Sequence, residues 1–173
     1  MALKWKNPQQ LDRYIRQAEQ ACRQAARETL AELGERMLTD ARNDVGKVRC
    51  FTDRTGNLRS SIGYVVVQQG QIVSEACGAP VVASAGYEAG SRPAQVQAES
   101  LAHAGAVAST LDKEKTWLVF VAGMDYASHV EARGFDVVTG TFDRYSSSEE
   151  LKALGVRFVG DVREAMSASE DRA

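Results

Sequence analysis

Apolar residues recur at steps of three and four positions along the first part of the chain, over residues 11–41. This period predicts one long amphipathic helix of about ten turns within residues 1–45. Asn7-Pro8 is typical of a helix start, Gly46 closes the helix, and Gly34 inside the pattern allows a bend. The apolar stripe is rich in alanine, and the helix is longer than a small sheet can cover. We therefore expect part of the stripe to contact a partner subunit.

Four segments downstream have the composition of β-strands. Ile62 to Gln68 and Gln71 to Cys77 flank Gln69-Gly70, which favours a β-hairpin with a tight turn. Thr116 to Ala122 is almost entirely apolar, a pattern typical of a central strand that is buried on both faces. Phe135 to Thr141 is the fourth candidate strand.

Further helices separate and follow these strands. We expect one from Pro93, a short one that Asp125 caps and that ends near Ala132, and a last one that the serines at 146–148 cap. Gly134 fits the left-handed residue after a helix. This order predicts an α+β fold with a long N-terminal helix, a small, mostly antiparallel sheet of about four strands, and flanking helices. We expect residues 1–173 to form a single domain, in which residues 78–115 are an inserted loop and helix.

Composition narrows the class of protein. The chain has 173 residues, a formal net charge of −2 and 44% hydrophobic residues, which is typical of a globular protein. No run approaches the roughly 18 consecutive apolar residues of a membrane-spanning helix, and the start of the chain does not have the pattern of a signal peptide. Three widely spaced cysteines, Cys22, Cys50 and Cys77, favour reduced cytosolic thiols over a disulfide framework or a zinc site.

Charge is distributed unevenly along the chain. Residues 1–60 carry 12 basic and 8 acidic side chains, whereas residues 61–173 carry 9 and 15. One interpretation is a solvated helix at one end of an acidic body. The other is attraction between opposite ends of neighbouring copies, as in a head-to-tail assembly. The small net charge argues against a dedicated nucleic-acid binder.

The common catalytic motifs do not occur in the sequence, which has no phosphate-binding loop, dinucleotide fingerprint, zinc-protease helix or serine-hydrolase elbow. The best catalytic candidate is Asp125 with His129, four residues apart on one helix face, where the carboxylate would polarise the imidazole. A nucleophile would then have to come from Cys50 or Ser61. The alternative is structural, with Asp125 as a helix cap and His129 exposed.

The turn at residues 55–57 also has two interpretations. With Arg54 and Arg59 it could cradle an anion through its backbone N–H groups, or it could only connect the first helix to the hairpin. His103, the other histidine, lies on the second long helix, where we interpret it as a structural or exposed side chain.

Two segments, each leading into a predicted strand, carry a family resemblance when they are read together. The first covers residues 53–62 and the second residues 121–134. The pair resembles the head–tail connection proteins of long-tailed phages, the neck or tail-completion proteins called gene-product-ten-like after a lambdoid phage. Members carry T-G-x-L-r-x-S after a long N-terminal helix and Y-A-x-x-V-E-x-G after a central strand. The matching residues are Thr55, Gly56, Leu58, Arg59, Ser61, Tyr126, Ala127, Val130, Glu131 and Gly134.

The resemblance covers about residues 8 to 165 and implies a structural virion protein, a tail-completion or minor tail protein of a phage or prophage. It implies a ring-type homo-oligomer at the head–tail junction, formed in the host cytoplasm during assembly, with neighbouring neck or tail proteins as partners. It implies no catalytic residue, no cofactor, no metal and no membrane. It implies no sequence-specific contact with nucleic acid, although genomic DNA could pass through the assembled lumen. Two alternatives are a small cytosolic enzyme that uses Asp125 and His129, and a monomeric protein-binding adaptor.

The matching residues are of types that build architecture. Leu58, Tyr126 and Val130 can pack on the sheet, and Arg59 and Glu131 carry opposite charges. We therefore expect an Arg59–Glu131 salt bridge, within or between subunits.

Two features depart from the family pattern. The insertion from Gly78 to Lys115 is longer than in compact members, and Gly134 is followed by Phe135-Asp136-Val137-Val138 instead of the commoner G-T ending.

Overall fold

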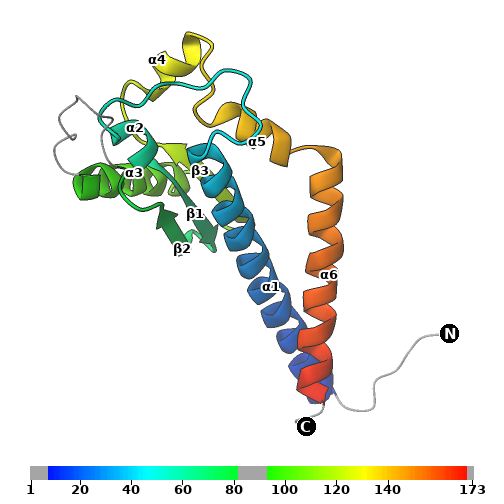
Figure 1. Cartoon of the computed structure of the whole chain (residues 1–173). Helices are drawn as coiled ribbons and strands as arrows, with labels where there is room; N and C mark the ends of the chain where they lie inside the picture. The colour runs from blue at the N-terminus through cyan, green and yellow to red at the C-terminus, as the bar shows by residue number, and fades with distance from the viewer. Residues whose placement is uncertain (1–7, 82–92, 171–173) are drawn as a thin grey trace.

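The computed structural model describes residues 8–81 and 93–170 of the chain (Figure 1). The order of its helices and antiparallel strands is that of an α+β fold with a long N-terminal helix, as the sequence predicts. The elements are α1 (Pro8–Arg42), α2 (Asn57–Ser60), β1 (Ile62–Gln68), β2 (Gln71–Cys77), α3 (Pro93–Ala108), β3 (Thr116–Ala122), α4 (Ala127–Ala132), α5 (Thr139–Tyr145) and α6 (Ser148–Glu170).

The sheet has three strands in the order β2-β1-β3, and both neighbours of β1 run antiparallel to it. Val65, in the middle of β1, lies opposite Glu75 of β2 and Val119 of β3. Among the described residues β3 is therefore an edge strand, and the prediction of a central position for it is wrong. The central strand is β1, whose residues Ile62 to Val67 are all buried.

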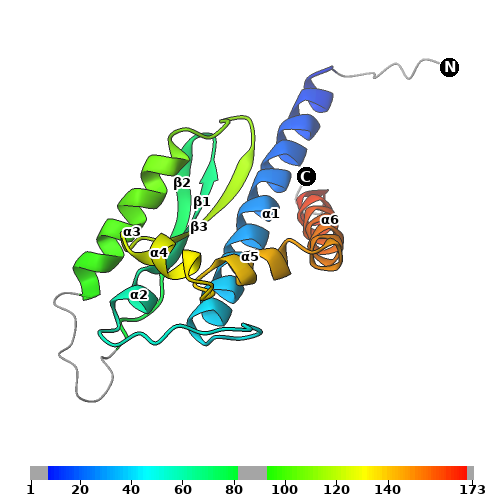
Figure 2. The same cartoon turned by 90° about the horizontal axis from the view of Figure 1, so that it is seen from above.

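One helix covers each face of the sheet (Figure 2). Tyr64 and Val66 of β1 pack in one core cluster with Leu38 of α1. Val65 and Val67 pack in a second cluster with Ala104 of α3. Successive side chains of a strand point to opposite faces, so the unbroken apolar run of β1 supplies both cores. The part of the inserted segment 78–115 that is described thus supplies one layer of the fold, while the predicted loop at 82–92 lies outside the described residues.

Helix α1 is continuous through Gly34 and ends at Arg42, a few residues before the predicted end. A Cβ atom at position 34 would lie 2.6 Å from the ring of Tyr64, so glycine permits the helix to cross the sheet closely. The Tyr64 hydroxyl donates a hydrogen bond to Glu35 Oε1 at 2.9 Å, and burial raises the pKa of Tyr64 to about 12. Gly46 adopts the left-handed conformation, with φ of 70°, in the turn that follows the helix.

The predicted fourth strand at Phe135 to Thr141 is wrong. Only Asp136 forms a bridge, to Cys50 of the loop after α1, and the chain then enters α5. The reason is that Glu131 Oε1 accepts hydrogen bonds from the backbone N–H groups of Val137, Val138 and Thr139, at 2.8 to 3.0 Å. Those N–H groups are the donors that a strand would need for a neighbouring strand.

Helices α1 and α6 run antiparallel beside each other and extend beyond the sheet (Figure 1). We call this pair the two-helix arm: α6 together with residues 8–32 of α1, up to the contact of Glu32 with Arg157. An ion pair between Glu32 and Arg157 and a hydrogen bond of 3.5 Å from Thr29 Oγ1 to Asp161 Oδ2 join the two helices. Glu149 and Glu150 lie in the first turn of α6, where the helix dipole favours acidic side chains. Within the described residues, none of these helices has the combination of length and apolar character that a bilayer crossing requires.

Candidate functional site and assembly surface

The two segments that carry the family resemblance meet at one end of the sheet. Ser61 O accepts a hydrogen bond from the N–H of Gly123 at 3.1 Å, and Ile62 lies opposite Ala122 at the ends of β1 and β3. Leu58 and Ala127 belong to the same core cluster, against which Val130 packs. Residues almost seventy positions apart thus form one corner of the fold, which we call the motif corner (residues 53–61 and 123–134).

In the first half of the motif corner, the Asp53 side chain closes the turn. The Asp53 carboxylate accepts the N–H of Gly56 at 2.9 Å and the N–H of Arg59 at 2.7 Å. Gly56 has φ of 79°, and a Cβ there would collide with the carbonyl oxygen of Val81. Asp53 therefore occupies the N–H groups that the anion-binding interpretation of this turn requires. This role of Asp53 is absent from the predictions above, although an aspartate shortly before a glycine commonly accepts the backbone N–H groups of a turn.

Ser61 is fully buried at the end of this turn. Its hydroxyl donates to Leu58 O at 2.8 Å, and its carbonyl oxygen accepts a bond of 2.5 Å from the Ser100 hydroxyl on α3. The turn continues into the single helical turn α2, whose N-cap is Gly56, and Thr55 Oγ1 accepts the N–H of Asn57 at 3.4 Å. Ser61 thus ties α2, α3 and the sheet together and is inaccessible to a substrate.

In the second half of the motif corner, two of the expected roles are different in the structure. Tyr126 is 40% exposed and lies before the first turn of α4, so the prediction that it packs in the core is wrong. Its ring lies beside the first motif: burial and the Asp53 carboxylate raise the pKa of its hydroxyl, while a hydrogen bond with Thr55 lowers it. Asp125 makes no capping hydrogen bond to α4, whose N-cap is Tyr126. Gly134 has φ of 79° after the helix, as predicted.

The Arg59–Glu131 salt bridge does not form within the chain. The Arg59 guanidinium pairs with the Asp44 carboxylate, donates to the carbonyl oxygen of Arg42 and lies 4.9 Å from the centre of the Phe51 ring. Glu131 is instead held by three backbone N–H groups. Burial raises the pKa of Glu131, but the hydrogen bonds from the backbone N–H groups and from the Thr139 hydroxyl outweigh burial, and the pKa lies below its ordinary value.

The catalytic candidates are not brought together. Asp125 and His129 are both exposed, and no hydrogen bond joins them in the described part of the chain. Cys50 is exposed in the loop after α1, and His103 is exposed on α3. Within residues 8–81 and 93–170, no group of three His, Cys, Asp or Glu side chains is placed to hold a metal ion.

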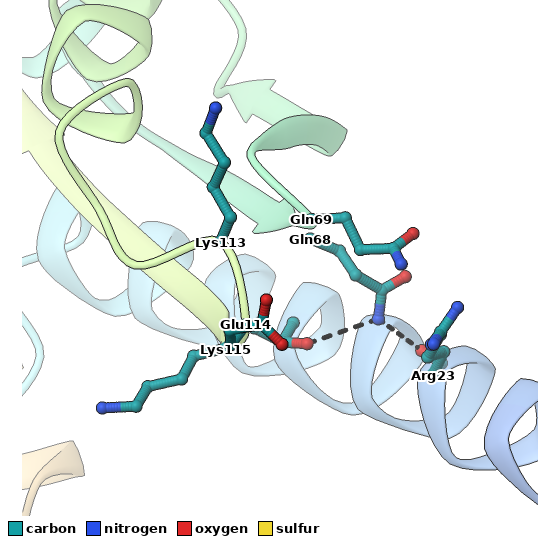
Figure 3. Close-up of a pocket in the computed structure, with 7 residues that line it drawn as sticks. Arg23, Gln68, Gln69, Lys113, Glu114 and Lys115 are labelled. Carbon is teal, nitrogen blue, oxygen red and sulfur yellow. Dashed lines mark hydrogen bonds between the residues drawn. The ribbon is translucent and has the colours of Figure 1, made fainter.

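A polar hollow lies where α1 passes the ends of β1 and β3 (Figure 3). Gln68 Nε2 donates to the carbonyl oxygen of Arg23 at 3.0 Å and to Thr116 Oγ1 at 3.3 Å. Lys113, Glu114 and Lys115 line the same hollow, and the lysine side chains extend away from the glutamine (Figure 3). This arrangement fastens the long helix to the sheet.

The two-helix arm carries several exposed large apolar side chains. Val156 is 76% exposed and Val159 47% on α6, and Tyr14 and Ile15 are 46% and 45% exposed on α1. The alanine-rich stripe of α1, by contrast, is largely covered within the subunit. Ala25 is buried, and α1 packs against α6 and the sheet. The surface available to a partner is therefore smaller than the stripe predicts and includes α6.

Comparisons of the chain with protein-family models, with curated proteins and with solved structures find no match.

Proposed function

We propose that the chain is a structural virion protein of a tailed phage or prophage, which acts at the head–tail junction by assembling with its own copies and by docking on neighbouring neck or tail proteins. The family resemblance of the two sequence segments supports this proposal, since the chain brings them together in one motif corner. The buried or internally bonded state of Ser61, Asp53 and Glu131 is consistent with an architectural role for that corner.

The observation that carries the proposal is the two-helix arm. An arm that extends beyond the sheet gives each copy a long lateral surface, and its exposed valines and Ile15 are the kind of apolar side chains that protein interfaces cover. The arm therefore supports an assembling protein better than an enzyme.

Assembly of the purified full chain tests the proposal. Light scattering and negative-stain imaging of the chain, alone and with a preformed ring of a connector protein from the same phage or prophage, should give rings or concentration-dependent assemblies in at least one of the two conditions. A chain that stays monomeric in both conditions contradicts the proposal.

His129→Ala provides the matched control, because His129 is exposed and lies outside the arm. Its stability should stay within about 0.5 kcal/mol of the unmodified chain, and its assembly should be unchanged. An enzymatic activity that this substitution removes from a folded chain would overturn the structural role in favour of the Asp125–His129 alternative.

A further inference from the structure

Helix α6 has an apolar outer face in addition to the face that packs on α1. Leu154, Phe158 and Asp161 lie toward α1, whereas Val156 and Val159 project from the other side and line a shallow hollow with Gly155 and Gly160. A Cβ atom at either glycine would meet no atom within 4 Å. The hollow is therefore open enough for the backbone of another helix to approach.

Charged side chains border this outer face in a defined order. Lys152 lies one turn before Val156 and Arg163 one turn after Val159, and both line the hollow. Glu149, which pairs with Lys152 at 3.0 Å, lies beyond Lys152. Read from the C-terminal end, α6 presents a positive charge, the two valines, a positive charge and then a negative charge.

One stripe of α1 has the complementary order. Asp12, Ile15, Glu19 and Arg23 follow each other at steps of three or four positions, so they lie on one side of the helix. Read from the N-terminal end, this donor stripe presents a negative charge, an isoleucine that is 45% exposed, a negative charge and then a positive charge, and Arg16 lies at its edge, one turn after Asp12. Glu19 and Arg23 form an exposed ion pair of 3.7 Å, so this end of the stripe faces solvent.

We propose that the donor stripe of one copy (Asp12, Ile15, Glu19, Arg23) docks on the outer face of α6 of a second copy. Ile15 then inserts beside Val156 and Val159 of the second copy, Glu19 pairs with Lys152, Asp12 reaches Arg163, and Arg23 reaches Glu149. The two helices run antiparallel in this contact. This inference rests on the proposed function, because it names the surface through which the copies would assemble.

The geometry of one subunit permits this contact to repeat. In the same chain, α6 pairs with a different part of α1, around Thr29 and Glu32, so both helices of the arm keep their internal contact. Each copy has one donor stripe and one acceptor face, which makes the contact heterologous. The contact places Ile15 of one copy level with Val156 of the next, whereas within one copy this level of α6 pairs with Glu32, about 25 Å further along α1. Neighbouring copies are therefore related by a rotation with a shift of about 25 Å along the arm, and repetition gives a staggered, open-ended array of alternating α1 and α6 helices.

Disulfide trapping tests the contact directly. In a full chain with Cys22→Ser and Cys50→Ser, the pair Ile15→Cys and Val156→Cys should give covalent dimers and higher oligomers under mild oxidation. A crosslink within one chain is excluded, because Glu32 pairs with Arg157 and Ile15 lies about 25 Å further along α1. The control pair, Ile15→Cys and Glu75→Cys, places the second thiol on β2 and should give none. Absence of oligomers from the first pair, or equal yields from both pairs, overturns the proposal.

Charge exchange gives a second, independent measurement. Glu19→Lys and Lys152→Glu should each reduce the association constant about tenfold, and the double variant should recover most of it. Lys115→Glu, an exposed charge outside both faces, should have no effect. Additive losses without recovery count against the contact. Rings that form without the predicted crosslinks would leave the proposed function intact and reject this interface. Crosslinked oligomers that never join a connector ring would support this interface and contradict the proposed function.

Discussion

At the scale of single residues, Asp53 and Glu131 organise the two halves of the motif corner by binding backbone N–H groups. Each carboxylate satisfies several N–H donors that no helix or strand satisfies. The sequence predicts that the second of them matters, but it assigns Arg59 as the partner. Charge type is visible in a sequence, whereas the partner of a carboxylate depends on which N–H groups the fold leaves without acceptors.

Replacement of Glu131 tests this role. Glu131→Ala leaves three backbone N–H groups without their acceptor, and the free energy of unfolding should fall by about 2 kcal/mol. Urea denaturation measures the change. Glu114→Ala, at an exposed position, should stay within about 0.5 kcal/mol. Equal effects of the two substitutions would contradict the role of Glu131.

The same residue gives the stability a pH dependence. The pKa of Glu131 is lower in the folded chain than its ordinary value of 4.5, so its stabilisation is present above that value and is lost as the pH falls through the folded pKa. Glu131→Gln should therefore lose less stability than the unmodified chain when urea denaturation is repeated at successively lower pH below about 4.5. Parallel loss in both chains would show that other carboxylates dominate the acid response.

At the scale of elements, the hairpin, α3, α6 and the extent of α1 follow from sequence period and turn residues, and the structure confirms them. The position of β3 within the sheet does not follow from the sequence period or from turn residues. Its apolar run predicts burial on both faces, but only Val121 of this edge strand is buried, and its other residues are partly exposed. The Phe135 to Thr141 segment has strand composition, yet a side chain four residues before it takes its N–H groups. Both errors arise from contacts that no local pattern contains.

Two glycines in helices allow a matched prediction. Gly34→Ala removes the glycine penalty but forces a methyl group to within 2.6 Å of the Tyr64 ring, and the net result should be a loss of about 1 to 3 kcal/mol. Gly155→Ala places the same group in open space on α6, and it should stabilise the subunit by about 0.5 to 1 kcal/mol. Thermal unfolding compares the two. If the Gly34→Ala chain unfolds at the same temperature as the unmodified chain, α1 can move away from the sheet.

At the scale of the whole molecule, the arm and the sheet body are stabilised by different contacts. A chain that begins at Gln24 lacks the donor stripe but keeps Thr29 and Glu32, which hold α6. It should retain the circular dichroism of the folded sheet and lose association with its own copies. Sedimentation velocity checks this, with the full chain as control. Undiminished association of the truncated chain would place the assembly surface elsewhere.

Salt should separate the electrostatic and apolar parts of assembly. The charged residues of both arm faces are exposed, so screening should slow association several-fold between low and high ionic strength. Dissociation should change little, because it depends on the apolar contact of Ile15 with the valines. Stopped-flow light scattering gives both rates. A dissociation rate that rises as steeply as the association rate falls would show that charge, and not apolar burial, holds the copies together.

The pairing of α1 with α6 also sets the order in which the parts of the chain fold. Glu32 and Arg157 are 125 positions apart, so the arm closes one of the longest loops in the chain, whereas the hairpin and its neighbours close short ones. Non-local contacts of this kind form late. During synthesis the three strands are complete before α6 exists, and a chain that stops early has a folded sheet but no acceptor face. Such a chain keeps the donor stripe and can dock on a finished copy, but it cannot accept a further copy, so only finished chains would extend an assembly.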